Sequence, residues 1–84
     1  MSHWNYRVMR RTYLSDFGGE TLDEIYEVHY DDNGNVTGWT ERPGGPCYYV
    51  DADDGEGSIR DDIQRMMEAC DKPILDYETG KEIE

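Results

Sequence analysis

The dipeptide Asn33-Gly34 constrains the fold of this chain more than any other feature. The residues before it, 25–31, alternate with the period of two that is typical of a strand. Asn and Gly tolerate the positive φ angles that both central residues of a two-residue hairpin turn require. The sequence therefore predicts an antiparallel hairpin in which 25–31 pairs with a returning strand over 36–42.

The register of this hairpin depends on the length of its turn. A two-residue turn sets Val28 opposite Trp39 and Tyr30 opposite Thr37, so that these side chains share one face. A longer, bulged turn would shift the pairing by one residue and move Trp39 to the other face. The sequence leaves both registers open.

Two further segments complete the predicted sheet. Residues 4–13 alternate aromatic or aliphatic with polar side chains and predict the first strand, which a turn cluster over 15–20 ends. The Pro-Gly-Gly-Pro segment 43–46 ends the sheet path, because proline donates no ladder hydrogen bond. Residues 47–50 are a candidate for a fourth, short edge strand.

One helix is predicted near the C-terminus. Ser58 is its expected N-cap, with a carboxylate three residues on, and Pro73 prevents the helix from continuing beyond about Asp71. Apolar residues recur between them at helical spacing and define a single stripe that is expected to pack on the sheet. This stripe consists of Ile59, Ile63, Met66, Met67 and Cys70.

These elements predict a small α+β domain. Its architecture is a three-stranded antiparallel β-meander, with a candidate fourth edge strand, packed against one C-terminal helix. We expect a single domain over 1–76 and a flexible, frayed acidic tail over 77–84.

The chain is strongly acidic, with 20 Asp and Glu against 8 Lys and Arg in 84 residues, a net charge of -12. Such a surface repels nucleic acid and anionic membranes and attracts basic protein surfaces or cations. We therefore expect a basic protein partner, for example a nucleic-acid-binding protein, and no direct contact with nucleic acid or membrane. Acidity that serves only solubility or salt tolerance is the alternative.

The acid excess is concentrated in the second half of the chain. Residues 1–42 carry eight acids and four arginines, whereas 43–84 carry twelve acids and four basic residues. The segment 51–62 alone has a net charge of -5, although its last two acids are also explained by the helix dipole. The candidate partner-binding residues are Asp31, Asp32, Asp51, Asp53, Asp54, Glu56, Asp61 and Asp62.

A second candidate surface is the face of the sheet opposite Tyr26, Val28 and Trp39. We expect this face to be open to solvent and locally basic. It would carry Arg7, Arg11 and Arg42 around Glu27 and His29, either as cross-strand ion pairs or as an interface anchor.

Motifs for catalysis or metal binding are weak. Counting Asp51 as the first calcium ligand places Gly55 at the fifth position and Glu56 where a sharp turn demands glycine. Cys47 with His29 lacks a third, orienting group, and Cys70 lies on the helix stripe, where we expect a buried, inert thiol. We therefore expect no enzyme activity, no cofactor and no metal site.

The cysteine count and the N-terminus bear on the compartment. Two cysteines are too few for a disulfide framework, and we expect both to be free thiols. The first thirteen residues lack an apolar run long enough for a signal peptide, and no stretch reaches the length of a membrane span. These features predict a cytoplasmic protein.

Three segments carry a resemblance to a group of small bacterial and phage proteins of unassigned function. They are the opening Trp-Asn-Tyr-Arg-Val at 4–8, the centre Tyr-Asp-Asp-Asn-Gly-Asn-Val-Thr-Gly-Trp-Thr-Glu at 30–41, and the closing Asp-Lys-Pro-Ile-Leu-Asp at 71–76. The resemblance covers about half of the chain. It implies a bacterial or phage origin and transfers no catalytic residue.

Two functions follow as hypotheses. The first is a non-catalytic acidic protein that docks on a basic partner, for example as a nucleic-acid mimic or a phage-type inhibitor similar to anti-CRISPR proteins. The alternative is a small housekeeping domain, acidic for solubility, that forms a homodimer through its sheet face or edge.

Overall fold

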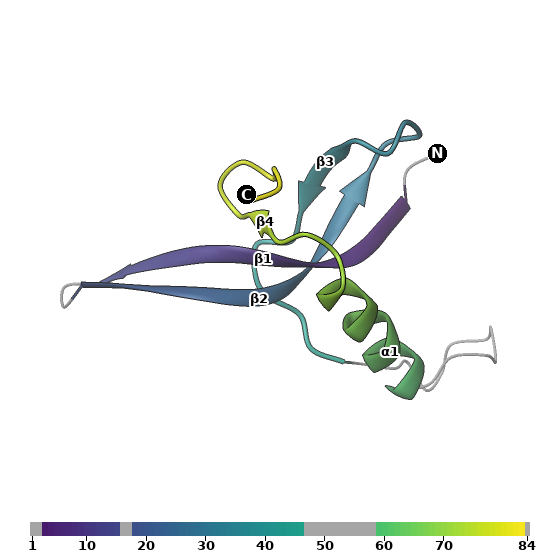
Figure 1. Ribbon diagram of the computed structural model, residues 1–84, viewed down its shortest axis with the longest axis horizontal. Coiled ribbons are helices and arrows are strands. Elements are labelled where there is room, and N and C mark those ends of the chain that lie inside the picture. The colour runs from purple at the N-terminus through teal and green to yellow at the C-terminus, as the bar shows by residue number, and fades with distance from the viewer. Residues whose placement is uncertain (1–2, 16–17, 47–58, 84) are drawn as a thin grey trace.

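The computed structural model of the chain describes residues 3–15, 18–46 and 59–83. Its elements follow in the order β1 (His3–Ser15), β2 (Gly18–Tyr30), β3 (Val36–Trp39), α1 (Ile59–Cys70) and β4 (Leu75–Asp76). The described strands form one sheet in the order β3-β2-β1-β4, in which β1, β2 and β3 are antiparallel and β4 is parallel to β1 (Figure 1). The predicted α+β class and the antiparallel meander are confirmed.

The β2–β3 hairpin confirms one predicted pair and corrects the other. Val28 lies opposite Trp39 as expected, but Tyr30 pairs with Val36, and the register shifts between His29 and Tyr30. The turn is longer than two residues, because residues 31–35 separate the paired Tyr30 and Val36 and the amide of Asp31 donates to the carbonyl of Asn35 at 2.9 Å. Among the described residues of this turn, Gly34 alone has a positive φ, of +82°. The predicted turn with two positive φ angles is therefore wrong.

The chain after β3 continues beside β2 although β3 itself ends at Trp39. The amide of Thr40 donates to the carbonyl of Glu27 at 3.0 Å, and the amide of Gly44 donates to that of Ile25 at 2.8 Å. The fourth strand of the sheet is β4, next to β1. The predicted edge strand at 47–50 lies outside the described residues.

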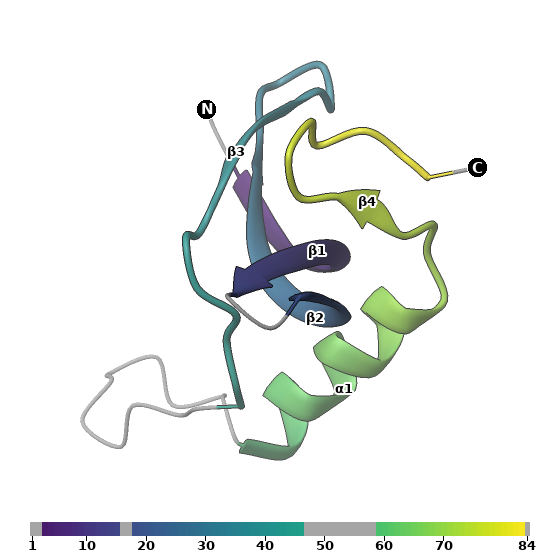
Figure 2. The ribbon, with the colours of Figure 1, turned by 90° about the vertical axis from the view of Figure 1, so that its left-hand side faces the viewer.

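Each face of the sheet carries its own apolar core. Met9, Tyr26, Val28 and Leu75 are buried together on one face, which β4 and the residues after it cover. Tyr6 is buried on the other face with Met66 and Ala69 of α1. Figure 2 shows α1 and the C-terminal segment on either side of the β1–β2 pair. The predicted open face of the sheet is therefore absent from the described fold.

Helix α1 is rotated relative to the prediction. Of the five residues in the expected stripe only Met66 is buried, and the small Ala69 takes a central place in the contact with the sheet. Asp62 and Arg65, both partly buried, also lie on the inward side. The remaining members of the expected stripe are exposed: Ile59, Ile63, Met67 and Cys70.

The C-terminal residues fold back on the sheet in place of the frayed tail expected for 77–84. The amide of Asp76 donates to the carbonyl of Lys81 at 2.8 Å, and that of Ile83 donates to Ile74 at 2.8 Å. Gly80 is buried and has a φ of +73°. The ring of Tyr77 lies 5.3 Å from that of Tyr26, measured between centroids. An aromatic contact and backbone hydrogen bonds thus hold this segment over the first core.

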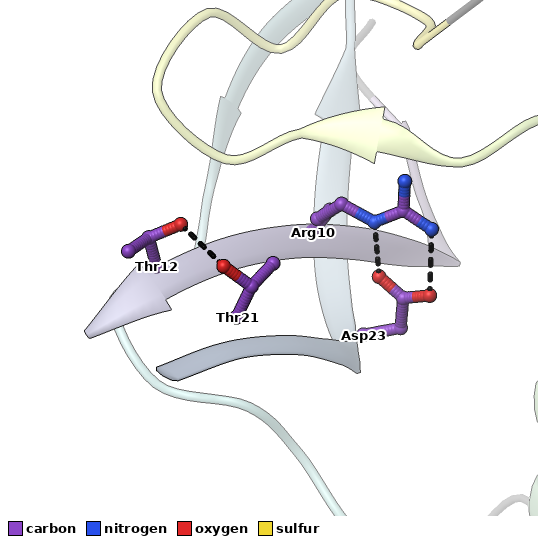
Figure 3. Close-up of polar contacts among 4 residues, drawn as sticks. All are labelled: Arg10, Thr12, Thr21 and Asp23. Atoms are coloured by element: carbon purple, nitrogen blue, oxygen red, sulfur yellow. Dashed lines mark hydrogen bonds and ion pairs between the residues drawn. The ribbon is translucent and has the colours of Figure 1, made fainter. Parts of the chain in front are cut away.

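The outer half of the β1–β2 pair extends from the body as a two-stranded arm (Figure 1). Two cross-strand contacts fix its register (Figure 3). Arg10 donates to both carboxylate oxygens of Asp23, at 2.8 and 3.0 Å, and the hydroxyls of Thr12 and Thr21 are 2.9 Å apart. Cross-strand pairs of this kind stabilise a sheet. They explain why β2 begins at Gly18 and not, as predicted, at Ile25.

Candidate interaction surfaces

Asp31 of the predicted acidic set organises the β2–β3 turn. Its carboxylate accepts hydrogen bonds from the amides of Asn33 and Asn35, both at 2.9 Å. These bonds, first that from Asn35, lower the pKa of Asp31. The carboxylate therefore has a structural role, while the neighbouring Asp32 is exposed.

Asp61 and Asp62 lie in the first turn of α1, where the helix dipole favours negative charge. The hydroxyl of Tyr6 donates to both carboxylate oxygens of Asp62, at 2.8 and 3.0 Å. This contact ties the start of the helix to β1. Asp61 is exposed on the outer side of the same turn.

The structure does not bring these two pairs of acids together. The β2–β3 turn and the first turn of α1 lie at opposite ends of the molecule in both views (Figures 1 and 2). The other predicted partner-binding residues, Asp51, Asp53, Asp54 and Glu56, lie outside the described residues. The described acids thus form two separate sites and not one continuous ridge.

Arg7 corrects the prediction of a basic open face. It lies opposite Tyr26 across the β1–β2 pair, so both side chains share the face that the C-terminal segment covers. Arg7 is only 9% exposed, and its guanidinium donates to the carbonyl of Pro73 at 2.7 Å and to the hydroxyl of Tyr30 at 3.2 Å. The buried cation therefore clamps the start of the C-terminal segment onto β1 and β2.

Arg11 is also engaged inside the molecule. Its guanidinium lies 4.0 Å from the ring centroid of Tyr77 and donates to the backbone carbonyl of Glu41 at 2.8 Å. Glu27 and His29 pair with Tyr6 and Trp4 and so lie on the opposite face from Arg7 and Arg11. The predicted basic patch does not form, and self-association through it loses its surface.

Tyr13, Glu24 and Tyr26 form a hydrogen-bonded cluster beside Arg11. The hydroxyl of Tyr13 donates to Glu24 at 2.7 Å and lies 3.2 Å from the hydroxyl of Tyr26. These contacts, first that with Tyr26, raise the pKa of Tyr13 well above its ordinary value. The cluster therefore keeps the phenol protonated, which suits a structural contact better than a general base.

Arg65 links α1 to the end of β1. Its guanidinium carbon lies 4.4 Å from the ring centroid of Trp4 and 5.3 Å from that of Tyr6. An arginine over an aromatic face contributes about 0.5–1 kcal/mol at an exposed site. This contact and the Tyr6–Asp62 hydrogen bond explain the rotation of the helix, because both polar residues turn toward the sheet.

Of the two candidate thiols, the structure describes Cys70. Cys70 is exposed, contrary to the expected buried position, and its thiol contacts the carbonyl of Met66 at 3.5 Å. Cys47 lies outside the described residues. Over residues 3–15, 18–46 and 59–83, no three His, Cys, Asp or Glu side chains are grouped to hold a metal ion.

No helix in the described part of the chain is long and apolar enough to cross a membrane.

The exposed row of α1 is a surface that the sequence did not identify. The sequence places Ile59, Ile63, Met67 and Cys70 in the core, because aliphatic residues at helical spacing normally face it. The signal that could have found this surface is the second row formed by Asp62, Arg65, Met66 and Ala69. Ala69 is small enough to let the helix pack closely on a strand. Asp62 and Arg65 can contact the tyrosine and tryptophan side chains of that strand.

Comparison with protein-family models, with curated proteins and with solved structures gives no significant match to this chain.

Proposed function

We propose that the chain is a non-catalytic interaction protein whose acidic surface docks on a basic protein partner. The observation that carries this proposal is the different use of the two charge types. The chain has 20 acidic and 8 basic residues. Arg7 and Arg11 hold backbone carbonyls, and Arg65 lies over an indole ring. However the cations are paired, the acidic groups outnumber them, and the chain keeps a net charge of -12.

The partner class follows from this charge distribution. A strongly negative surface steers basic proteins toward it and repels nucleic acids and anionic lipids. A nucleic-acid-binding protein offers a basic face already suited to phosphates, which carboxylates can imitate. We therefore favour a nucleic-acid mimic of the phage-inhibitor kind, as several anti-CRISPR proteins are, acting in a bacterial cytoplasm. The acidic segment 51–62 is the expected contact.

A salt-titrated pull-down from nuclease-treated bacterial lysate tests this proposal. We expect the chain to capture a basic nucleic-acid-binding protein and to release it as salt rises. Capture should be lost in the variant Asp51→Asn, Asp53→Asn, Asp54→Asn, Glu56→Gln. The matched control removes the same four charges from exposed positions elsewhere: Glu20, Glu41, Glu78 and Glu82, each changed to Gln.

The two variants separate specific docking from general acidity. Retained capture by the control, with loss in the 51–56 variant, supports docking through the acidic segment. Equal loss in both variants points to an effect of net charge only. Capture that is unchanged by neutralising 51–56, or no captured basic protein at all, contradicts the proposal.

A further inference from the structure

The turn between β2 and β3 exposes the dipeptide Asn33-Gly34. Gly34 has a φ of +82°, and a Cβ added to it would meet no atom within 4 Å, so the space beside its Cα is open. The backbone amide of Asn33 donates to the carboxylate of Asp31 at 2.9 Å, but no described residue binds its side-chain amide. The side chain of Asn33 can therefore rotate toward the backbone that follows it.

This arrangement favours a reaction within the turn itself. The backbone nitrogen of the residue after an asparagine is tethered close to the asparagine Cγ, and such proximity replaces an encounter between two molecules. Glycine in that place has no Cβ to shield the nitrogen, and its backbone reaches the conformations that ring closure needs. We propose that Asn33 is a site of spontaneous deamidation. This inference does not depend on the proposed docking.

The reaction consumes one water and releases one ammonia. The nitrogen of Gly34 attacks Cγ of Asn33, a bond between them forms, and the bond from Cγ to Nδ2 breaks. Ammonia leaves with the proton of the Gly34 amide, and a succinimide ring remains. Water then opens the ring at Cγ, which gives aspartate, or at the main-chain carbonyl of Asn33, which gives isoaspartate. Either product adds one negative charge at neutral pH.

The two other asparagines of the chain are held in place and provide internal controls. Asn5 lies within β1, where its Oδ1 accepts from the amide of Tyr6 at 2.9 Å. Asn35 donates its backbone amide to the carboxylate of Asp31 at 2.9 Å and its side-chain amide to the same group at 3.5 Å. The residue that follows it is the β-branched Val36, which crowds the attacking nitrogen. Deamidation should therefore be confined to Asn33.

One hydrogen bond of the turn opposes the reaction. The amide of Gly34 donates to the carbonyl of Asp31 at 3.1 Å, so this bond must open before the nitrogen can attack. The net contribution of one exposed hydrogen bond is small, and we expect Asn33 to react roughly two- to tenfold more slowly in the folded chain than in a free peptide of the same sequence.

Isoaspartate would break the closure of the turn. It adds a methylene to the backbone between Asp31 and Asn35, whose backbone groups are joined by a hydrogen bond of 2.9 Å. The pairing of Tyr30 with Val36 comes directly after this bond. The isoaspartate form should therefore unfold at a lower urea concentration than the variant Asn33→Asp, which has the same charge and an ordinary backbone.

Peptide mapping by mass spectrometry tests the site. The full chain and a free peptide of residues 30–36 are incubated at mildly alkaline pH, and each asparagine is followed by the gain in mass that replaces an amide by a carboxyl group. An isoaspartyl methyltransferase assay identifies the isoaspartate product. Urea unfolding followed by tryptophan fluorescence then compares the separated isoaspartate form with Asn33→Asp.

We expect the mass gain at Asn33 and not at Asn5 or Asn35, with isoaspartate among the products. An unreacted Asn33 after the free peptide has been converted, or equal conversion of all three asparagines, would overturn the proposed site. An isoaspartate form as stable as Asn33→Asp would overturn the breaking of the turn.

Discussion

Replacing Gly80 with alanine tests whether the C-terminal segment packs on the sheet. Gly80 has a φ of +73°, and a Cβ added to it would lie 2.5 Å from Cζ3 and 2.9 Å from Cη2 of Trp39. An L-residue in this conformation costs roughly 1–2 kcal/mol. Crowding against a packed ring costs about 1–3 kcal/mol more. We therefore expect Gly80→Ala to lower the free energy of unfolding by about 2–5 kcal/mol.

Two other glycines provide matched controls for this substitution. Gly34 has a similar φ of +82°, but an added Cβ would meet no atom within 4 Å, so Gly34→Ala should show the backbone cost alone. Gly38 lies in β3 with a negative φ and equally open space, so Gly38→Ala should be neutral or slightly stabilising. The difference between the Gly80 and Gly34 variants isolates the contact with Trp39.

Urea unfolding followed by tryptophan fluorescence measures these differences, and thermal melts followed by circular dichroism provide a second measurement. A loss of 1 kcal/mol lowers the melting temperature of a domain of this size by about 4–8 °C. Gly80→Ala should therefore melt at least about 8 °C below the native chain. If it is no less stable than Gly34→Ala, the ring of Trp39 does not pack on Gly80 and the segment is frayed, as the sequence suggested.

Three further substitutions probe single contacts. Arg7→Lys cannot keep both hydrogen bonds of the guanidinium, so it should lower the free energy of unfolding in urea by about 1–3 kcal/mol. Unchanged stability would show that Arg7 does not hold the C-terminal segment on the sheet. Hydrogen bonding with Tyr26 raises the pKa of Tyr13 above the 10.0 of an unfolded chain, so its stabilising contribution is present below pH 10 and is lost as the pH rises further. The urea midpoint of Tyr13→Phe should therefore fall less steeply above pH 10 than that of the native chain. The amide of Asn35 lowers the pKa of Asp31 below 3.8, so this carboxylate stabilises the fold above that pH and loses its effect as the pH falls through the folded value. Asp31→Asn should flatten the acid limb of the stability curve, and an identical limb would contradict this role.

The sequence predicts the elements of this fold better than their mutual placement. Alternation within a strand shows which residues share a face, and it correctly separates Tyr6 from Arg7. It contains no information on how two strands are aligned, because a shift of one residue exchanges their faces. Here Arg7 lies opposite Tyr26, so the aromatic residues Trp4 and Tyr6 of β1 lie on one face of the sheet. Tyr26 and Tyr30 of β2 lie on the other face. This alignment explains why both faces need covering and why the expected basic patch is absent.

Strand β4 and the segment after it carried no periodic signal. A two-residue strand is too short to alternate, and its parallel pairing with the distant β1 has no local signature. Its position depends on tertiary contacts: the clamp by Arg7, the rings of Tyr26 and Tyr77, and the glycine beneath Trp39. Tertiary contacts of this kind cannot be read from the sequence, and without them a charged tail with few apolar residues is expected to fray.

The rotation of α1 shows how a few polar contacts can outweigh an aliphatic stripe. Facing Ile63 and Met67 inward would bury more apolar area, but it would turn Asp62 away from Tyr6 and Arg65 away from Trp4. The observed orientation also lets Ala69 approach the sheet closely, which a larger side chain would prevent. This orientation leaves Ile59, Ile63 and Met67 exposed.

The contacts of the arginines and the excess of carboxylates link the fold to the proposed docking. Arg7 and Arg11 stabilise the core through carbonyls and aromatic rings, and the 20 carboxylates of the chain outnumber its 8 cations. Those carboxylates repel one another, so added salt should stabilise the folded chain while it weakens attraction to a basic partner. Stability and docking thus respond to salt with opposite signs. If a urea midpoint that rises with salt confirms this stabilisation, a loss of capture at high salt does not arise from unfolding of this chain and reports weakened electrostatic attraction to the partner.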